Sequence, residues 1–232
     1  MRRRMKKPWH KANPALLAKI RADVEREYPD LRVFEADHMI YVEGAFSLIC
    51  EGETVDRYEI KLRLPPDFPD SIPALQETAG RIPRKPCRHV NPNGDACPIV
   101  PEEWLLRPDH DSILSFLNGP VRNFFLGQSL VEQGEPWPFG ERPHGFDGLF
   151  QAYGEMLGTT DRARIRSYLE CLSKETIKGH WGCPCGSGKR LRNCHLNEVR
   201  ALRERIPLKL AHQALARLTE QTNQNAAVPK HR

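Results

Sequence analysis

The spacing of apolar residues changes near Arg32, and this change limits the folds open to the chain more than any other feature. From there to about Thr78, apolar and polar residues alternate, which is the period of strands with one buried face. The alternating apolar positions are Phe46, Leu48, Cys50, Tyr58, Ile60, Leu62 and Leu64. The segment Glu51-Gly52-Glu53 separates the two runs and is typical of a turn. The pattern predicts an antiparallel meander of three or four strands.

Helical spacing frames this meander on both sides. Asn13-Pro14 has the residue types of a helix start, and apolar residues then recur at helical intervals until Pro29. After the meander, we expect Asp111 to cap a helix that runs through Phe125. A further helix is expected from Thr160, with one apolar face formed by Ile165, Leu169 and Leu172. The fold class predicted from these patterns is α+β.

The composition excludes an integral membrane protein. Of the 232 residues, 39% are hydrophobic and 28% are charged, and no apolar run approaches the roughly 18 residues that a bilayer-spanning helix needs. The basic first residues are followed by Pro8-Trp9-His10 rather than by the apolar stretch of a signal peptide. We therefore expect a cytoplasmic protein without a membrane partner.

The net charge of +5 conceals an uneven distribution. Residues 1–11 carry six cations and no acid, and residues 188–232 carry a net charge of +7, which leaves −8 for the body between them. An acidic body favours protein partners. A basic helix is expected after Asn197, with an apolar face of Val199, Leu202, Ile206 and Leu210. Because it lacks interleaved aromatic residues, nucleic-acid binding is the less favoured role for it.

Four potential metal ligands lie close together near the C-terminus. The chain has seven cysteines, an odd number that favours thiol or metal chemistry over a complete disulfide framework. Cys183, Cys185, Cys194 and His195 fall within 13 residues, and three thiolates with one imidazole complete a tetrahedral zinc site. The segment resembles the SEC-C motif, a small zinc-binding module. With all four positions filled by protein, the zinc would be structural rather than catalytic.

The segment from Gly80 to Arg107 has no clear periodicity, and long irregular segments inside compact domains are usually functional. It follows a proline-rich stretch, Leu64 to Pro73, which suits an extended connection better than a central strand. A cysteine in an exposed loop can accept an acyl group as a thioester and pass it to an amine. Cys97 fits that position.

The order of these motifs resembles the ubiquitin-conjugating enzyme family. The resemblance rests on the strand Tyr58 to Leu64 with its proline-rich continuation, and on the later residues His89, Asn91, Gly94, Cys97 and Trp104. It covers roughly Asn13 to Gln128. The fold it implies has an N-terminal helix, an antiparallel four-strand meander and C-terminal helices, followed here by the small helical zinc-binding module.

The resemblance also implies roles for individual residues. Cys97 would be the catalytic nucleophile, Asn91 the amide donor that stabilises the oxyanion, and His89 a brace of the loop rather than a base. Asp109 and Asp111 are candidates for orienting or deprotonating an incoming lysine, Asp111 with a mainly structural role as the expected helix cap. No cofactor beyond structural Zn²⁺ is implied.

Four departures from the family pattern bear on these roles. Val90 replaces the usual proline, and the stretch between Asn91 and Cys97 is about two residues shorter. Pro98 directly follows Cys97, and Ile99 stands where many relatives have an aspartate. Whether Asn91 reaches the oxyanion is therefore left open. Cys87, close to His89, is interpreted as an incidental thiol, with a regulatory disulfide or a second thioester site as alternatives.

The shortened loop and the segment from Gly134 to Gly145 are similar to bacterial conjugating-enzyme-like proteins of antiphage operons. These include the signalling defence called CBASS and the bacterial ubiquitin-like conjugation operons. The resemblance implies a partner with a flexible C-terminus, either a CD-NTase (a cGAS-like nucleotidyltransferase) or a ubiquitin-like protein. It also implies a target-protein lysine and, in some systems, a separate activating enzyme.

We expect two domains and two flexible ends. Residues 12–158 would form the conjugating-enzyme-like domain, and residues 159–221 a helical region that contains the metal motif at 183–195. The segments 1–11 and 222–232 are expected to be flexible. Two other functions remain open: a catalytically silent module that binds a partner's C-terminal tail, or a nucleic-acid-associated protein that acts through its basic tail.

Overall fold

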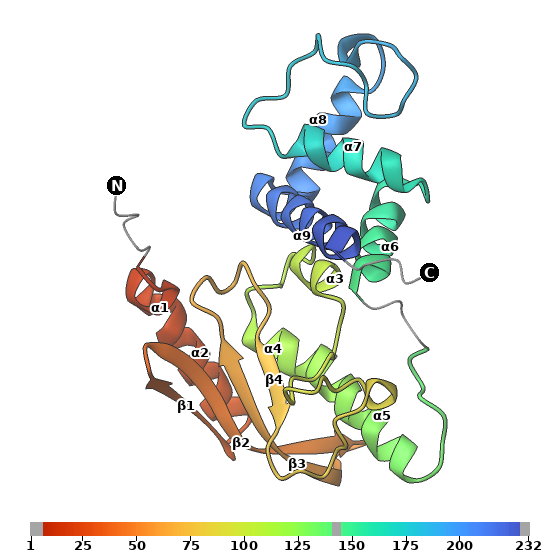
Figure 1. Cartoon of the computed structure of the whole chain (residues 1–232). Coiled ribbons are helices and arrows are strands. Elements are labelled where there is room, and N and C mark those ends of the chain that lie inside the picture. The colour runs from red at the N-terminus through yellow and green to blue at the C-terminus, as the bar shows by residue number, and fades with distance from the viewer. Residues whose placement is uncertain (1–6, 141–144, 228–232) are drawn as a thin grey trace. The chain divides into compact units, whose positions relative to one another are not determined.

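The computed structural model describes residues 7–140 and 145–227, and the side chains at 145–146 and 220–227 are not described. Contacts within the chain divide it into two compact units, residues 1–141 and residues 142–232 (Figure 1). None of the helices in the described ranges has the length and hydrophobicity to cross a bilayer.

The first unit contains a four-stranded antiparallel sheet in the order β1-β2-β3-β4, as the alternating pattern predicts. The strands are β1 (Leu31–Ala36), β2 (Met39–Cys50), β3 (Glu53–Leu64) and β4 (Ala74–Glu77). The turn between β2 and β3 has positive φ at both Glu51 and Gly52, which matches the right-handed twist of the paired strands. The α+β class and the meander are confirmed.

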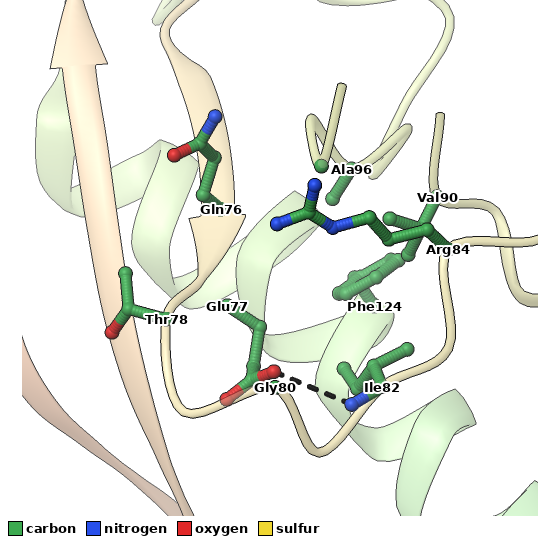
Figure 2. Close-up of a pocket in the computed structure, with 10 residues that line it drawn as sticks. Gln76, Glu77, Thr78, Gly80, Ile82, Arg84, Val90, Ala96 and Phe124 are labelled. Atoms are coloured by element: carbon green, nitrogen blue, oxygen red, sulfur yellow. Dashed lines mark hydrogen bonds between the residues drawn. The ribbon is translucent and has the colours of Figure 1, made fainter. Parts of the chain in front are cut away.

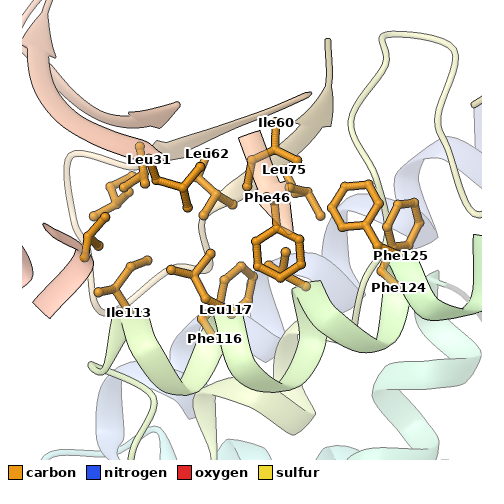
Figure 3. Close-up of a cluster of buried hydrophobic side chains, with 14 of the residues drawn as sticks. Leu31, Phe46, Ile60, Leu62, Leu75, Ile113, Phe116, Leu117, Phe124 and Phe125 are labelled. Atoms are coloured by element: carbon orange, nitrogen blue, oxygen red, sulfur yellow. The ribbon is translucent and has the colours of Figure 1, made fainter. Parts of the chain in front are cut away.

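Helices cover one face of this sheet (Figures 1 and 3). They are α2 (Pro14–Glu27), α4 (Ile113–Phe116) and α5 (Arg122–Glu132). The short α3 (Pro101–Leu105) lies in the connection that precedes α4. As expected, Asn13 caps α2, because its side chain accepts a hydrogen bond from the backbone of Leu16. A π-helical turn joins α4 to α5 and contains Pro120; a proline inside a helix removes one backbone donor and disturbs regular α-helix geometry.

The core of the first unit lies between the sheet and the helices α4 and α5. Figure 3 shows sheet residues facing the helices, with Phe46 of β2 close to the aromatic side chains of α5. The ring centroids of Phe46 and Phe125 are 5.8 Å apart, and those of Tyr58 and Phe125 are 4.4 Å apart. All three side chains are buried. Such aromatic pairs add to the stabilisation from buried area.

The described part of the first eleven residues is folded, which corrects the expectation of a flexible end at 1–11. Residues Trp9–Ala12 form the short helix α1. Trp9 is buried, and its ring lies 5.1 Å from that of Phe68. The large apolar area of a tryptophan holds this segment against the proline-rich connection. Residues 1–6 lie outside the described residues.

The second unit is helical. It consists of α6 (Gly145–Leu157), α7 (Arg162–Leu172), α8 (Leu196–Arg205) and α9 (Leu208–Ala227), together with the metal-motif loop between α7 and α8. Ile165, Leu169 and Leu172 of α7 are buried, as their spacing predicts. Asp161 caps this helix by accepting hydrogen bonds from two backbone N–H groups.

Three boundaries differ from expectation. The first unit ends at 141 rather than 158, because α6 packs with α7 and α9 of the second unit. The basic helix after Asn197 is two helices, which separate at Pro207, a residue that cannot donate a backbone hydrogen bond. The second of these helices continues to Ala227, where a flexible end was expected from 222; residues 228–232 lie outside the described residues.

Polar contacts tie the segment after β4 to α5. The Arg81 guanidinium lies 2.7 Å from a carboxylate oxygen of Asp56 and 2.6 Å from one of Glu132, and it holds the pKa of Asp56 well below its usual range. The fully buried Gln128 accepts a hydrogen bond from Arg88 Nε and donates one to the Arg88 carbonyl, both at 2.7 Å. These bonds fix the backbone directly before His89.

We predict that Gln128→Ala destabilises the first unit. The change leaves the Arg88 carbonyl and guanidinium without their buried partner, so we expect a loss of about 1–3 kcal/mol. Urea unfolding followed by tryptophan fluorescence measures this change. Gln133→Ala, at an exposed position one turn later, is the control and should be close to neutral. Equal stability of both variants would show that the two hydrogen bonds between Gln128 and Arg88 do not stabilise the first unit.

Candidate active site and metal centre

Cys97 follows a small hairpin that docks on strand β4. Val90 pairs with Ala96 as an isolated antiparallel bridge, and the Cys97 N–H donates to the His89 carbonyl at 2.8 Å. The Ala96 N–H in turn donates to the Leu75 carbonyl of β4 at 2.8 Å. Thus the segment without periodicity is ordered by backbone hydrogen bonds to the sheet. We call residues 90–96 the hairpin.

A second set of bonds holds the turn of the hairpin. The Asp95 carboxylate accepts hydrogen bonds from Gln76 Nε2 at 2.8 Å and from Asn93 Nδ2 at 2.9 Å. The backbone of Asp95 accepts a further bond from the Asn91 N–H at 2.9 Å. Gly94 has φ +92°, a conformation that side chains disfavour. Asp95 therefore joins the hairpin turn to β4.

Asn91 and Cys97 are in direct contact. Asn91 Nδ2 donates to Cys97 Sγ at 3.3 Å, and both residues are exposed. Because side chains alternate along a strand, Asn91, Asp95 and Cys97 lie on one face of the hairpin and Val90 and Ala96 on the other. The shortened loop thus brings the amide to the sulfur, and the group on that sulfur would be open to solvent.

The surroundings of Cys97 disfavour the thiolate. Partial withdrawal from water raises the pKa of the thiol, the Asn91 amide lowers it, and the negative charge of Asp95 raises it again. The net pKa lies above the ordinary value, so the resting thiol is mainly protonated at neutral pH. A nucleophile of this kind needs its proton removed during the reaction.

His89 is packed in the way expected of a residue that holds the loop in place. It is buried, has φ +50°, and its ring lies 4.4 Å from that of Trp137. Trp137 packs directly on helix α5, where a Cβ on Gly127 would lie 2.5 Å from the indole ring. Glycine at this position makes the close approach of the indole possible. Sequence reasoning singled out the segment that contains Trp137 but not its contact with His89.

Trp104 is also buried, and its ring packs against Phe116. Its indole N–H donates to the His110 carbonyl at 3.1 Å, which fixes the loop that carries Asp109 and Asp111. The role of Trp104 here is therefore structural.

The two candidate aspartates lie in a different environment from the one expected. Arg107 binds both carboxylate oxygens of Asp109, at 2.9 and 3.0 Å, and lowers the pKa of Asp109 to about 2. Asp111 is exposed, and the cap of α4 is Ser112, whose side chain accepts from the Ser115 N–H. The expected helix cap was therefore one residue too early. Within the described ranges, neither carboxylate bonds to Asn91 or Cys97.

The four expected metal ligands lie together in the second unit. One ligand atom from each of Cys183, Cys185, Cys194 and His195 lies within 4.8 Å of all the others. The Cys185 and Cys194 sulfur atoms are 3.7 Å apart, close to the edge of about 3.8 Å for a tetrahedron with Zn–S bonds of about 2.3 Å. The residues present therefore fit a tetrahedral zinc ion.

Local backbone geometry produces this cluster. The Cys183 N–H donates to the Lys189 carbonyl at 2.9 Å, and the Leu191 N–H donates to the Trp181 carbonyl at 2.7 Å. Gly186 and Gly188, between the ligand pairs, both have positive φ, as their placement suggested. The tight turn brings the first two ligands against the last two.

Comparison of the chain with protein-family models, curated proteins and solved structures returns no match. The functional argument therefore rests on the structure together with the sequence patterns described above. Of the contacts around Cys97, the sequence pattern indicated the pair with Asn91. Gln76, Asp95 and Gln128 were missed, because single polar residues in irregular segments carry no periodic signal.

We predict opposite effects of two neighbouring substitutions on the Cys97 thiol. Asn91→Ala removes the hydrogen bond that favours the thiolate and should raise the pKa. Asp95→Asn removes a negative charge and should lower it. The rate of iodoacetamide modification at Cys97, followed against pH by peptide mass spectrometry, reports both shifts. Glu25→Gln, on an exposed position of α2, is the charge control. Shifts of the same sign in both variants would refute this reading of the site.

We predict that the purified chain contains about one zinc ion and that this ion stabilises the loop between α7 and α8. Cys194→Ser should lower the zinc content and increase hydrogen exchange in residues 181–195. The exposed Cys87→Ser should leave both unchanged, because Cys87 is outside the cluster. Elemental analysis of the two variants decides the matter, and full zinc occupancy in Cys194→Ser would exclude these ligands.

Proposed function

We propose that this chain is a ubiquitin-conjugating-enzyme-like acyl carrier. In this proposal Cys97 holds the C-terminus of a partner protein as a thioester and transfers it to an amine. The observation that carries the proposal is the contact between Asn91 Nδ2 and Cys97 Sγ at an exposed site. The order of a helix, a four-strand meander, a proline-rich connection, a cysteine loop and further helices supports it. That order is the one expected of the family.

The first step is thioester exchange. The Cys97 sulfur, after losing its proton, attacks the carbonyl carbon of an activated partner tail. The bond from that carbon to the former carrier breaks, and the carrier leaves with the bonding electrons and takes up the proton that Cys97 lost. Because its pKa is raised, Cys97 is protonated at rest, and its proton must be removed as this step proceeds. The exposure of Cys97 leaves room for an extended tail and for an attacking amine.

The second step is aminolysis. A lysine amine attacks the thioester carbonyl and an oxyanion forms. Its collapse breaks the C–S bond and expels the Cys97 sulfur with the bonding electrons, and the proton lost by the nitrogen restores the Cys97 thiol. An amide N–H already within reach of the sulfur lies near the place where that negative charge develops. Loss of one such donor costs roughly 10²–10³ in rate. Asn91 is a neutral donor, so it stabilises the oxyanion without repelling the amine.

The remaining named residues have positioning roles in this proposal. His89, against Trp137, sets the backbone that precedes Asn91. Asp109 is held by Arg107 as an ionised carboxylate at neutral pH, so it can attract a lysine ammonium to the site but is too weak a base to deprotonate it. The zinc of the second unit maintains the fold of its own loop and takes no part in the chemistry.

The partner is proposed from the same resemblance. A nucleotidyltransferase or a ubiquitin-like protein with a flexible C-terminus would be the acyl donor, in a defence operon, and an upstream activating enzyme would consume the ATP. Under this proposal the chain acts in the cytoplasm and needs no nucleic acid.

We predict that Cys97 variants separate covalent transfer from simple binding. The chain is co-expressed with the proteins encoded beside its gene, and intact mass is measured with and without thiol reductant. The wild type should give an adduct that reductant removes, Cys97→Ser an ester that resists it, and Cys97→Ala none. Cys87→Ser is the matched control and should behave as the wild type.

Two outcomes would contradict the assignment. An adduct that is sensitive to reductant and survives Cys97→Ala would place the chemistry on another sulfur. A non-covalent complex of equal affinity in all variants, with no added mass in any, would identify a silent tail-binding module instead.

A further inference from the structure

A cavity of about 230 Å³ lies between the end of β4 and the hairpin. Figure 2 shows it in close-up, with Gln76 and Thr78 on the strand side and Ile82, Val90 and Phe124 on the other. The volume is slightly below the roughly 300–1,000 Å³ of sites for drug-sized molecules. It therefore suits a molecule smaller than a typical drug.

The two charged side chains that line the cavity, Glu77 and Arg84, differ in their hydrogen bonding. Glu77 accepts hydrogen bonds from the backbone N–H groups of Ala79 at 2.8 Å and Ile82 at 3.3 Å, which offset its negative charge. Arg84 is exposed and makes no hydrogen bond or ion pair with any residue that the structure describes. In Figure 2 its guanidinium extends over the cavity on the side of Ala96, whereas Glu77 lies on the side of Gly80.

These features define the chemistry of a ligand. The planar fork of an arginine matches the two oxygens of a carboxylate. Ile82, Val90 and Phe124, each at most 6% exposed, form the apolar floor of the cavity, and an apolar ring on this floor would cover what remains exposed of it. A neutral or cationic molecule would gain no charge-assisted hydrogen bond from the guanidinium. A small carboxylate with an aromatic body satisfies both parts, because its ring can lie on the apolar floor while its charge faces Arg84 and away from Glu77.

The cavity also lies behind the reactive thiol. Val90 and Ala96 form the bridge of the hairpin and line the cavity, whereas Asn91 and Cys97 lie on the opposite face by strand alternation. At the turn of the hairpin, a Cβ on Gly94 would lie 3.3 Å from the Arg84 guanidinium carbon. A ligand held by Arg84 would therefore touch the hairpin at both its turn and its bridge.

We propose that this cavity binds a small aromatic carboxylate and that its occupancy changes the reactivity of Cys97 through the hairpin. The site takes no part in the acyl-transfer chemistry proposed above and does not depend on it. Binding can be measured on the free protein, and thiol reactivity can be measured with a simple alkylating agent.

The test uses the full chain with benzoate, phenylacetate and indole-3-acetate as probes and benzamide as the neutral match. Two-dimensional NMR should show saturable shifts at Val90 and Ala96, with a dissociation constant on the order of 1 mM, as small ligands of this size allow. Arg84→Gln should weaken binding about tenfold or more, because a charge-assisted hydrogen bond is lost. Arg21→Gln, on an exposed position of α2, should not.

Three results would overturn the proposal. Absence of saturable shifts with all three carboxylates would exclude the site. Equal binding by Arg84→Gln, or by benzamide, would exclude the carboxylate specificity. An unchanged rate of iodoacetamide modification at Cys97 under saturating carboxylate would exclude coupling to the thiol, whereas a change of about twofold or more, lost in Arg84→Gln, would support it.

Discussion

The site depends on the docking of the hairpin against strand β4. One backbone bond, from Ala96 to Leu75, and one side-chain bond, from Gln76 to Asp95, set the position of the hairpin on the sheet. With the hairpin in place, the distance between Asn91 and Cys97 follows from its own geometry. Each such bond has a modest net effect in isolation. Together they convert an irregular segment into a defined surface.

The sheet can support the hairpin because the sheet itself is held by long strand pairing and by packing against helices on one face. Long strands β2 and β3 pair along most of their length, and their inner residues pack on α4 and α5. The segment that follows β4 is tied to the same helix α5 through Arg81 and Gln128. The hairpin therefore docks on the sheet, and helix α5 holds the segment that leads into it.

Much of the fold could be predicted from the sequence. The alternation from Phe46 to Leu64 is a strong local signal, and the meander, the helix after Asn13 and the apolar face of α7 were correctly predicted from such signals. The metal cluster was also predictable, because its ligands are close in sequence.

In contrast, the expected cap at Asp111 was wrong, since Ser112 and Asp111 are both good cap residues and only tertiary packing decides between them. The helix at Trp9 was missed for a similar reason, because it is held by contacts with the distant residues Phe68 and Glu35 rather than by a periodic pattern. Contacts such as Gln128 with Arg88 join residues forty positions apart and leave no trace in local composition.

The hairpin has one more effect, on the sheet itself. Strand β4 is the last strand, and an uncovered outer strand offers free amide and carbonyl groups to any other chain. Here the backbone contacts of the hairpin with Leu75 and Gln76 occupy part of the free edge of β4. A partner that lifted the thiol-bearing loop would consequently uncover a short template for pairing. An extended polypeptide could then add alongside β4 as a fifth strand.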